Sequence, residues 1–208
     1  MARGKFLTVE GTEGVGKSTN IAFIQSFLEE RGIDLVVTRE PGGTPLAEEL
    51  REMLLAKREE TFNATAELLI IFAARAQHLQ TIILPALAQG RWVLSDRFTD
   101  ATFAYQGCGR GLNIEHITLL ENLVQGELRP DCTFLLDIDV KVGLQRAQQR
   151  AELDRFECEK IEFFENVRQG YLARVAENPR RYQKINAGQD LASVQKDLYK
   201  ALTELVNV

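Results

Sequence analysis

The sequence predicts an α/β fold in which a parallel sheet of five strands is flanked on both faces by helices. Short apolar runs typical of buried strands alternate with helical segments of ten or more residues, and this alternation is typical of parallel strands joined by crossover helices. An acidic residue lies near the end of most of these runs, at the edge of the sheet where such folds gather their functional groups. The predicted strands are 6–9, 35–37, 92–94, 133–136 and 182–185.

The first strand leads into a glycine-rich loop, Gly11–Thr19, that fits the phosphate-loop pattern G-x-x-x-x-G-K-[ST]. Apolar residues then recur with helical spacing from 21 to 28. In the order strand, loop, helix, the loop N–H groups and the positive end of the helix converge on one anion-binding point. The candidate nucleotide-binding residues are Gly11, Thr12, Glu13, Gly14, Val15, Gly16, Lys17, Ser18 and Thr19, with Lys17 reaching the β- and γ-phosphates and Ser18 ligating Mg²⁺.

Bulk properties limit the class of protein. The 208 residues suit one domain, 1–208, and the net charge of −5 with a pI of about 5.3 argues against a general nucleic-acid binder. The three cysteines, Cys108, Cys132 and Cys158, form no C-x-x-C pair, so we expect reduced thiols in a cytoplasmic protein and no structural zinc. We find no signal peptide and no uninterrupted apolar run long enough to span a bilayer.

The helical segments differ in how deeply the pattern predicts them to be buried. Residues 46–54 predict an amphipathic helix, and a polar stretch, 57–65, separates it from a long apolar helix. The segment 68–88 has too few polar residues for a surface helix, so we expect it to be central to the core and to bend or end near Pro85.

Two carboxylates compete for the metal-binding role opposite the phosphate loop. Asp96 directly follows the strand 92–94 and Ser95, and Asp137 directly follows the strand 133–136. A carboxylate in this position holds Mg²⁺ in P-loop enzymes. We assign Asp96 with Ser18 to the metal, but the pattern alone does not rank Asp96 above Asp137.

Arginines predict an anionic acceptor beside the nucleotide. Arg39, Arg51, Arg75 and Arg97 lie in or just after segments that converge on the carboxyl edge of the sheet, and a second group lies between 143 and 157. A phosphate monoester acceptor is already largely ionised at pH 7 and needs no general base. The absence of a candidate base agrees with this, since His78 is interpreted as a packed or exposed helix residue.

Several motifs resemble bacterial thymidylate kinase. They are the phosphate loop with Glu at its third position, the segment 38–44 (TREPGGT), Asp96-Arg97-Phe98, 104–107 (AYQG), Arg110-Gly111, 129–131 (RPD) and 153–155 (LDR). The resemblance runs from the first strand to the last helix. It implies a three-layer P-loop fold with a mobile lid at about 146–160, transfer of the γ-phosphoryl group of ATP to dTMP with Mg²⁺ to give dTDP, and a cytoplasmic homodimer.

The resemblance also implies roles for residues in the acceptor site. Arg51 and Arg97 match positions that hold the acceptor phosphate, and Arg75 matches the arginine that hydrogen-bonds the thymine edge. The family usually stacks thymine on a Phe four residues before that arginine. Here Ile71 occupies that position, and Phe72, three residues before Arg75, is our candidate. The remaining candidates are Glu40 in the dTMP site, Thr102 and Gln106 beside the base, and Tyr105 as the wall beneath the sugar.

Catalytic charge is expected from the lid. The family has an arginine either in the phosphate loop or in the lid, and Glu13 in this loop implies the lid pattern. Arg150 and Arg155 are then the candidate fingers over the transferring phosphoryl group, although Gln148 and Ala151 stand where relatives often have Arg and Gly. The predicted catalytic set is Lys17, Arg97, Arg150 and Arg155, with Arg146 packing on adenine and Ala187 lining the same pocket.

Two other functions are compatible with a phosphate loop. Another small P-loop kinase, acting on a different monophosphate or on an alcohol, is the nearest, and an alcohol acceptor would require a base such as Asp100. A GTP-dependent switch is disfavoured because the sequence contains neither an N-K-x-D guanine motif nor a D-x-x-G switch element.

Overall fold

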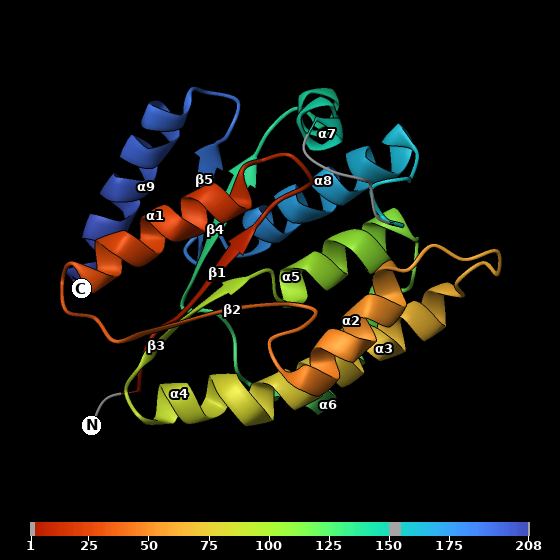
Figure 1. The fold of residues 1–208 in the computed structure, drawn as a ribbon, viewed down its shortest axis with the longest axis horizontal. Coiled ribbons are helices and arrows are strands. Elements are labelled where there is room, and N and C mark those ends of the chain that lie inside the picture. The colour runs from red at the N-terminus through yellow and green to blue at the C-terminus, as the bar shows by residue number, and fades with distance from the viewer. Residues whose placement is uncertain (1–2, 150–154, 208) are drawn as a thin grey trace.

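The computed structural model describes residues 3–149 and 155–207. Among these residues, five parallel strands form one sheet in the order β2-β3-β1-β4-β5. This confirms the predicted α/β fold with a five-stranded parallel sheet (Figure 1). The strands are β1 (Phe6–Glu10), β2 (Leu35–Arg39), β3 (Trp92–Asp96), β4 (Cys132–Asp137) and β5 (Tyr182–Asn186).

Helices connect consecutive strands and cover both faces of the sheet, as the crossover rule for parallel strands requires (Figure 1). The segments η1 and η2 have π-helical hydrogen bonding. The helical elements of the described residues are α1 (Lys17–Glu29), α2 (Pro45–Leu55), α3 (Ala64–His78), η1 (Leu79–Ile83), α4 (Leu84–Ala88), α5 (Thr99–Thr102), η2 (Phe103–Gly109), α6 (Ile114–Gln125), α7 (Val140–Gln148), α8 (Ile161–Glu177) and α9 (Leu191–Val206).

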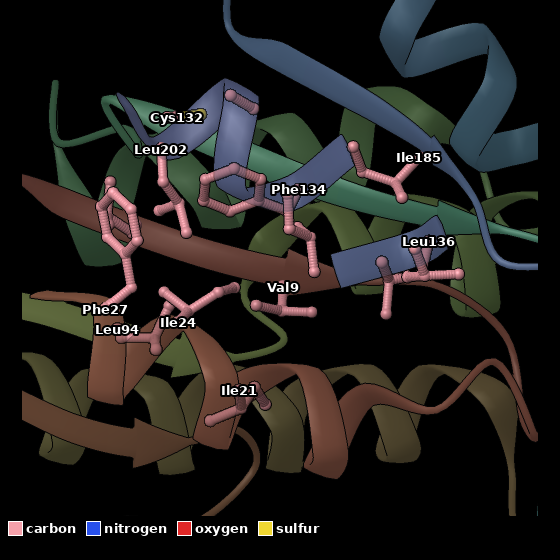
Figure 2. Packing of buried hydrophobic residues seen from close by; sticks show 14 of the residues in the cluster. Val9, Ile21, Ile24, Phe27, Leu94, Cys132, Phe134, Leu136, Ile185 and Leu202 are labelled. Atoms are coloured by element: carbon pink, nitrogen blue, oxygen red, sulfur yellow. The ribbon is translucent and has the colours of Figure 1, made fainter. Parts of the chain in front are cut away.

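The main hydrophobic core lies between the sheet and the layer formed by α1 and α9. Figure 2 shows Val9 and Phe134 of the sheet packed with Ile24 of α1 and Leu202 of α9, all of them fully buried. On the opposite face a second cluster packs Phe6 and other strand residues against η1 and α4. The three central strands, β1, β3 and β4, are therefore buried on both sides, which explains why their sequences are continuous apolar runs.

The long apolar helix of the prediction is α3, η1 and α4 in succession, Ala64–Ala88. The π-helical turn η1 ends at Ile83, two residues before Pro85, whose ring and missing N–H are incompatible with regular α-helical bonding to residue 81. Among the described residues, this is the one helical stretch long and apolar enough, by length and composition alone, to cross a membrane. Its buried side chains, including Leu68, Phe72 and Ile83, pack into the core clusters.

The register of the sheet brings the ends of three strands level. Asp96 is paired with Val9 of β1 and with Arg39 of β2, and the Glu40 amide donates to the Asp96 carbonyl at 2.9 Å. The residues that follow β1, β2 and β3 therefore meet at one edge of the sheet, which is where the candidate site lies.

Candidate active site

The loop between β1 and α1 has the geometry of a phosphate cradle. Gly14 and Gly16 have φ angles of 72° and 87°, in the left-handed region that favours glycine. The Lys17 ammonium lies inside the loop and donates to the carbonyl oxygens of Gly11 and Thr12 at 3.3 and 3.2 Å. Burial, together with the nearby Arg97 charge, lowers the pKa of Lys17 to about 8. A polyphosphate bound in the loop would stabilise this ammonium by adding negative charge beside it.

Glu13 of the loop binds two predicted site residues. Its Oε1 accepts from Arg97 Nη2 at 3.0 Å and from the Tyr105 hydroxyl at 2.7 Å. Arg97 also donates from Nη1 to the Gly11 carbonyl at 2.9 Å, and its guanidinium lies 4.7 Å from the centre of the Tyr105 ring. Glu13 therefore ties the phosphate loop to the residues expected at the acceptor phosphate and sugar.

Arg97 is held in an unusual backbone conformation. Its φ of 68° makes it the one non-glycine residue with positive φ in the described ranges. The Arg97 amide donates to the Val9 carbonyl at 3.0 Å, and the Ser95 hydroxyl donates to the Arg97 carbonyl at 2.7 Å. A conformation of this kind persists only where several contacts enforce it, and it is found most often at functional sites.

A single cavity of about 360 Å³ extends from the phosphate loop to α3 and η2. Gly11 and Thr12 line a smaller hollow beside it. Thr19 is exposed on α1 and lines neither. The predicted residues that line the large cavity are Glu13, Gly14, Val15, Gly16, Lys17, Ser18, Glu40, Arg51, Arg75, Asp96, Arg97, Thr102, Tyr105 and Gln106.

The end of the cavity away from the phosphate loop contains a buried ion pair. Arg75 Nε donates to Glu40 Oε2 at 2.7 Å, and Arg75 Nη2 donates to the Thr102 hydroxyl at 3.0 Å. The third guanidinium nitrogen, Nη1, is buried and has no hydrogen-bond partner in the part of the chain that the structure describes. A buried donor without a partner is costly, so this nitrogen is suited to a ligand acceptor atom such as a base carbonyl.

Phe72, the candidate for stacking on the base, does not line the cavity. Ile71 lines the cavity, whereas Phe72 is 2% exposed and packs with Leu68 and Phe103 in a core cluster. The Phe72 ring lies 4.7 Å from the Arg75 guanidinium, so its link to the site is through that side chain. Adjacent residues on a helix point about 100° apart. Because both faces of α3 are apolar, the sequence pattern did not reveal which residue faces the cavity.

The structure separates the two candidate metal carboxylates. Asp96 lines the cavity with Ser18, and its Oδ1 is buried without a hydrogen-bond partner among residues 3–149 and 155–207. Asp137 instead accepts from Arg168 of α8 at 2.7 and 3.3 Å and lines the smaller hollow. Asp96 is therefore the carboxylate that remains open to a ligand.

The lid arginines are only partly described. Arg150 lies outside the described residues. Arg155 is engaged away from the phosphate loop: its Nη2 lies 2.7 Å from Glu67 Oε2, and its Nε donates to the Leu54 carbonyl at 2.8 Å. Its guanidinium also lies 4.3 Å from the centre of the Phe156 ring. In this conformation the Arg155 guanidinium is paired with Glu67 and does not line the large cavity.

Arg146 and Ala187 are in contact, as expected for residues that share a pocket. Arg146 Nη1 donates to the Ala187 carbonyl at 3.1 Å. The first turn of α7, the helix that carries Arg146, contacts the phosphate loop. A Cβ built on Gly14 would lie only 1.8 Å from the Gly143 carbonyl oxygen. Arg146 thus lies on a helix that packs directly against the phosphate loop, and its contact with Ala187 joins that helix to the turn after β5.

Three buried polar residues around the cavity had no specific role in the sequence-based prediction. His78 is fully buried and bonds to Glu40 and Thr38, and Glu67 accepts from Gln106 Nε2 at 2.8 Å. Glu10 accepts from the Tyr171 hydroxyl, and burial raises its pKa to about 8. Isolated polar residues in apolar segments were the available signal, since a buried polar group requires a partner.

Comparisons with known proteins agree with this geometry. The family model described as thymidylate kinase matches residues 9–198. A thymidylate kinase of Teredinibacter turnerae is 67% identical over 199 residues, 96% of this chain and 97% of that protein. One from Ectopseudomonas mendocina is 58% identical over 203 residues, 98% and 97% of the two chains.

The fold is matched as well. The crystal structure of thymidylate kinase from Ehrlichia chaffeensis superposes with a TM-score of 0.78 at 33% identity, covering 97% of this chain and 99% of that one. The family model covers most of the chain, and the relatives are similar over nearly their whole length. The chain therefore belongs to the thymidylate kinase family.

Proposed function

We propose that this protein transfers the γ-phosphoryl group of ATP to dTMP, giving ADP and dTDP, as a single kinase domain of 208 residues. The observation that carries the proposal is the cavity itself, which joins a phosphate loop at one end to the buried Arg75–Glu40 pair at the other. One space thus holds groups suited to a donor polyphosphate and to a polar base edge. The acceptor is a phosphate monoester and needs no general base.

The donor end would bind ATP through the loop amides and Lys17. The loop N–H groups and the N-terminus of α1 attract the phosphates, and the Lys17 ammonium, whose pKa burial lowers to about 8, gains a favourable partner when they bind. The Arg146–Ala187 contact supports an adenine site at α7. The triphosphate would then lie along the loop with its γ-phosphoryl group directed into the cavity.

Ser18 and Asp96 fit the Mg²⁺ that accompanies ATP. The unpartnered Asp96 Oδ1 is a buried carboxylate oxygen, and the Ser18 side chain lines the same cavity. Hard oxygen donors of this kind suit Mg²⁺. When bound, the ion neutralises charge on the β- and γ-phosphate oxygens.

The acceptor end would recognise dTMP by placed donors and by shape. Arg75 Nη1 is free to donate to a thymine carbonyl, and Thr102 and Gln106 line the cavity beside it. Arg51 and Arg97 also line it and are suited to the acceptor phosphate. The Tyr105 ring is fixed by its hydroxyl bond to Glu13, so its position can exclude a ribose 2′-hydroxyl.

Transfer itself depends on positive charge around the moving phosphoryl group. Lys17 and Arg97 line the reacting part of the cavity and would stabilise charge on the equatorial oxygens. Arg150 and Arg155 are the further arginines that we propose for this role. Arg155 would have to exchange Glu67 and the Leu54 carbonyl for the phosphoryl group.

ATP consumption with a panel of nucleoside monophosphates tests the function. We expect dTMP to have the highest kcat/KM of the panel, which should include dUMP, dCMP, UMP and AMP. Activity on UMP or AMP above that on dTMP would overturn the assignment. Arg75→Met should raise the KM for dTMP while leaving the KM for ATP near its original value, because Arg75 lies at the acceptor end only.

We also propose that the protein is a homodimer in the cytoplasm. Leu69 of α3 and Leu119 and Leu123 of α6 are 52%, 68% and 76% exposed, on two helices that pack together through Leu68 and Ile117. Such a face is suited to a second copy of the chain. Cys108, Cys132 and Cys158 are all free thiols in the structure, which supports a reducing compartment. Light scattering should give a dimer, and Leu119→Glu should shift it towards the monomer.

A further inference from the structure

His78 lies behind the acceptor end of the cavity and not in its wall. The side chain is fully buried, and both ring nitrogens have polar partners. Nδ1 lies 3.1 Å from Glu40 Oε1, and Nε2 lies 2.6 Å from the Thr38 hydroxyl oxygen. The imidazole of α3 therefore joins the end of β2 to the carboxylate that holds Arg75.

The charges around the ring determine its tautomer. Arg75 Nε donates to the other oxygen of Glu40, Oε2, at 2.7 Å. Arginine is always protonated, so Glu40 is its carboxylate partner and can only accept hydrogen bonds. Nδ1 of His78 must then carry the hydrogen, and Nε2 can accept from the Thr38 hydroxyl. The neutral imidazole satisfies both contacts without a second buried positive charge.

The orientation of the Glu40 carboxylate depends on both of these donors. His78 holds one carboxylate oxygen and Arg75 the other, so the carboxylate is clamped from two sides within the buried network. Arg75 in turn is held by Glu40 and by the Thr102 hydroxyl, which leaves Nη1 as its one buried unpartnered nitrogen among the described contacts. Loss of the His78 donor would leave Glu40 Oε1 unsatisfied and would free the carboxylate to turn.

The backbone of the loop that carries Glu40 packs closely against the hydrogen bond between His78 and Thr38. A Cβ built on Gly43, whose φ is 87°, would lie 2.5 Å from His78 Nε2 and 2.6 Å from Thr38 Oγ1. A side chain at this position would therefore clash with the His78–Thr38 pair. The close fit is an independent indication that residues 38–44 are arranged around the imidazole.

We propose that His78 is a positioning residue for recognition of the acceptor base: its Nδ1–H fixes the Glu40 carboxylate, which aligns Arg75 so that Nη1 is presented to the bound nucleotide. The inference rests on the proposed role of Arg75 in reading that base. His78 touches no substrate and acts through Glu40.

Three substitutions separate this role from simple core packing. His78→Asn retains an N–H near the position of Nδ1, His78→Gln places its amide near the position of Nε2, and His78→Leu has neither. We expect His78→Gln and His78→Leu to raise the KM for dTMP about tenfold or more, and His78→Asn to raise it less than about threefold. The KM for ATP should change little in all three. The preference for dTMP over dCMP, measured as the ratio of kcat/KM values, should fall in the Gln and Leu variants alone.

A packing role predicts a different pattern, in which the melting temperature falls and the dTMP KM and the dTMP:dCMP ratio do not. That result, or an Asn variant as impaired as the Gln variant, overturns the proposal. If His78→Leu does not fold, the comparison of the Asn and Gln variants still tests the proposal, because both carry the same amide group at different positions. Arg75→Met, measured in parallel, separates the proposed role of Arg75 from that of His78. Unchanged dTMP kinetics in that variant overturn the proposed role of Arg75 and the His78 inference with it. A raised dTMP KM in Arg75→Met, with no difference in dTMP kinetics among the His78 variants, overturns only the His78 inference.

Discussion

Substitution of Gly14 by alanine tests the contact between the phosphate loop and α7. Gly14 has a φ of 72°, and a Cβ there would lie 1.8 Å from the carbonyl oxygen of Gly143. Gly32 is a matched control, since its φ is also 72° but no heavy atom lies within 4 Å of its Cβ position. The two variants share the cost of a left-handed alanine and differ in the steric contact.

The expected magnitudes follow from these two terms. A left-handed alanine costs about 1–2 kcal/mol, which is the whole effect expected for Gly32→Ala. In Gly14→Ala, backbone atoms must separate by more than about 1 Å to reach ordinary contact, and overpacking of this kind adds about 1–3 kcal/mol. We therefore expect Gly14→Ala to lose about 2–5 kcal/mol of unfolding free energy.

Function should separate the two variants further. A misplacement of about 1 Å in a reacting site can cost about 100-fold in rate, so Gly14→Ala should raise the KM for ATP and lower kcat, while Gly32→Ala should retain both. Urea unfolding and steady-state kinetics with ATP and dTMP measure these quantities. Equal unfolding free energies and equal ATP kinetics in the two variants would refute the argument that Gly14 is required by the close approach of α7.

Three further outcomes are expected. Asp96→Asn should weaken the Mg²⁺ dependence of the reaction and lower kcat far more than Asp137→Asn, and equal losses would contradict the metal assignment. The fold raises the pKa of Glu10 to about 8, so the unfolding free energy of the wild type should fall as pH rises from about 4.5 to 8. Over that range the unfolding free energy of Glu10→Gln, measured by urea unfolding, should rise relative to that of the wild type. A difference between the two that does not change with pH would contradict this. Arg155→Ala should lower kcat with little change in either KM, and unchanged turnover would exclude it as a finger.

Local patterns in the sequence were sufficient for the donor half of the site. The phosphate loop is contiguous, from Gly11 to Thr19, and its strand and helix flank it directly, so its fold and its anion-binding chemistry were predicted before any long-range contact was known. The alternation of apolar runs and helices likewise predicted the parallel sheet, because the central strands are buried on both faces. The resemblance to thymidylate kinases supplied the acceptor residues, most of which line one cavity.

The tertiary structure decided what depends on contacts between distant segments. Asp96 and Asp137 follow equally apolar strands, and they differ because Arg168 of α8 pairs with Asp137. Ile71 and Phe72 are adjacent in an apolar helix, so only the packing of α3 determines which of them faces the cavity.

His78 shows the same dependence, since its role comes from Thr38 and Glu40, about forty positions away along the chain. Arg155, which the resemblance suggested as a catalytic finger, pairs in this structure with Glu67 of α3. The sequence by itself therefore determined the loop, the sheet and the family, which depend on local spacing and apolar pattern. The choice among chemically equivalent side chains was left to the fold, because charge pairing and burial depend on which segments meet in space.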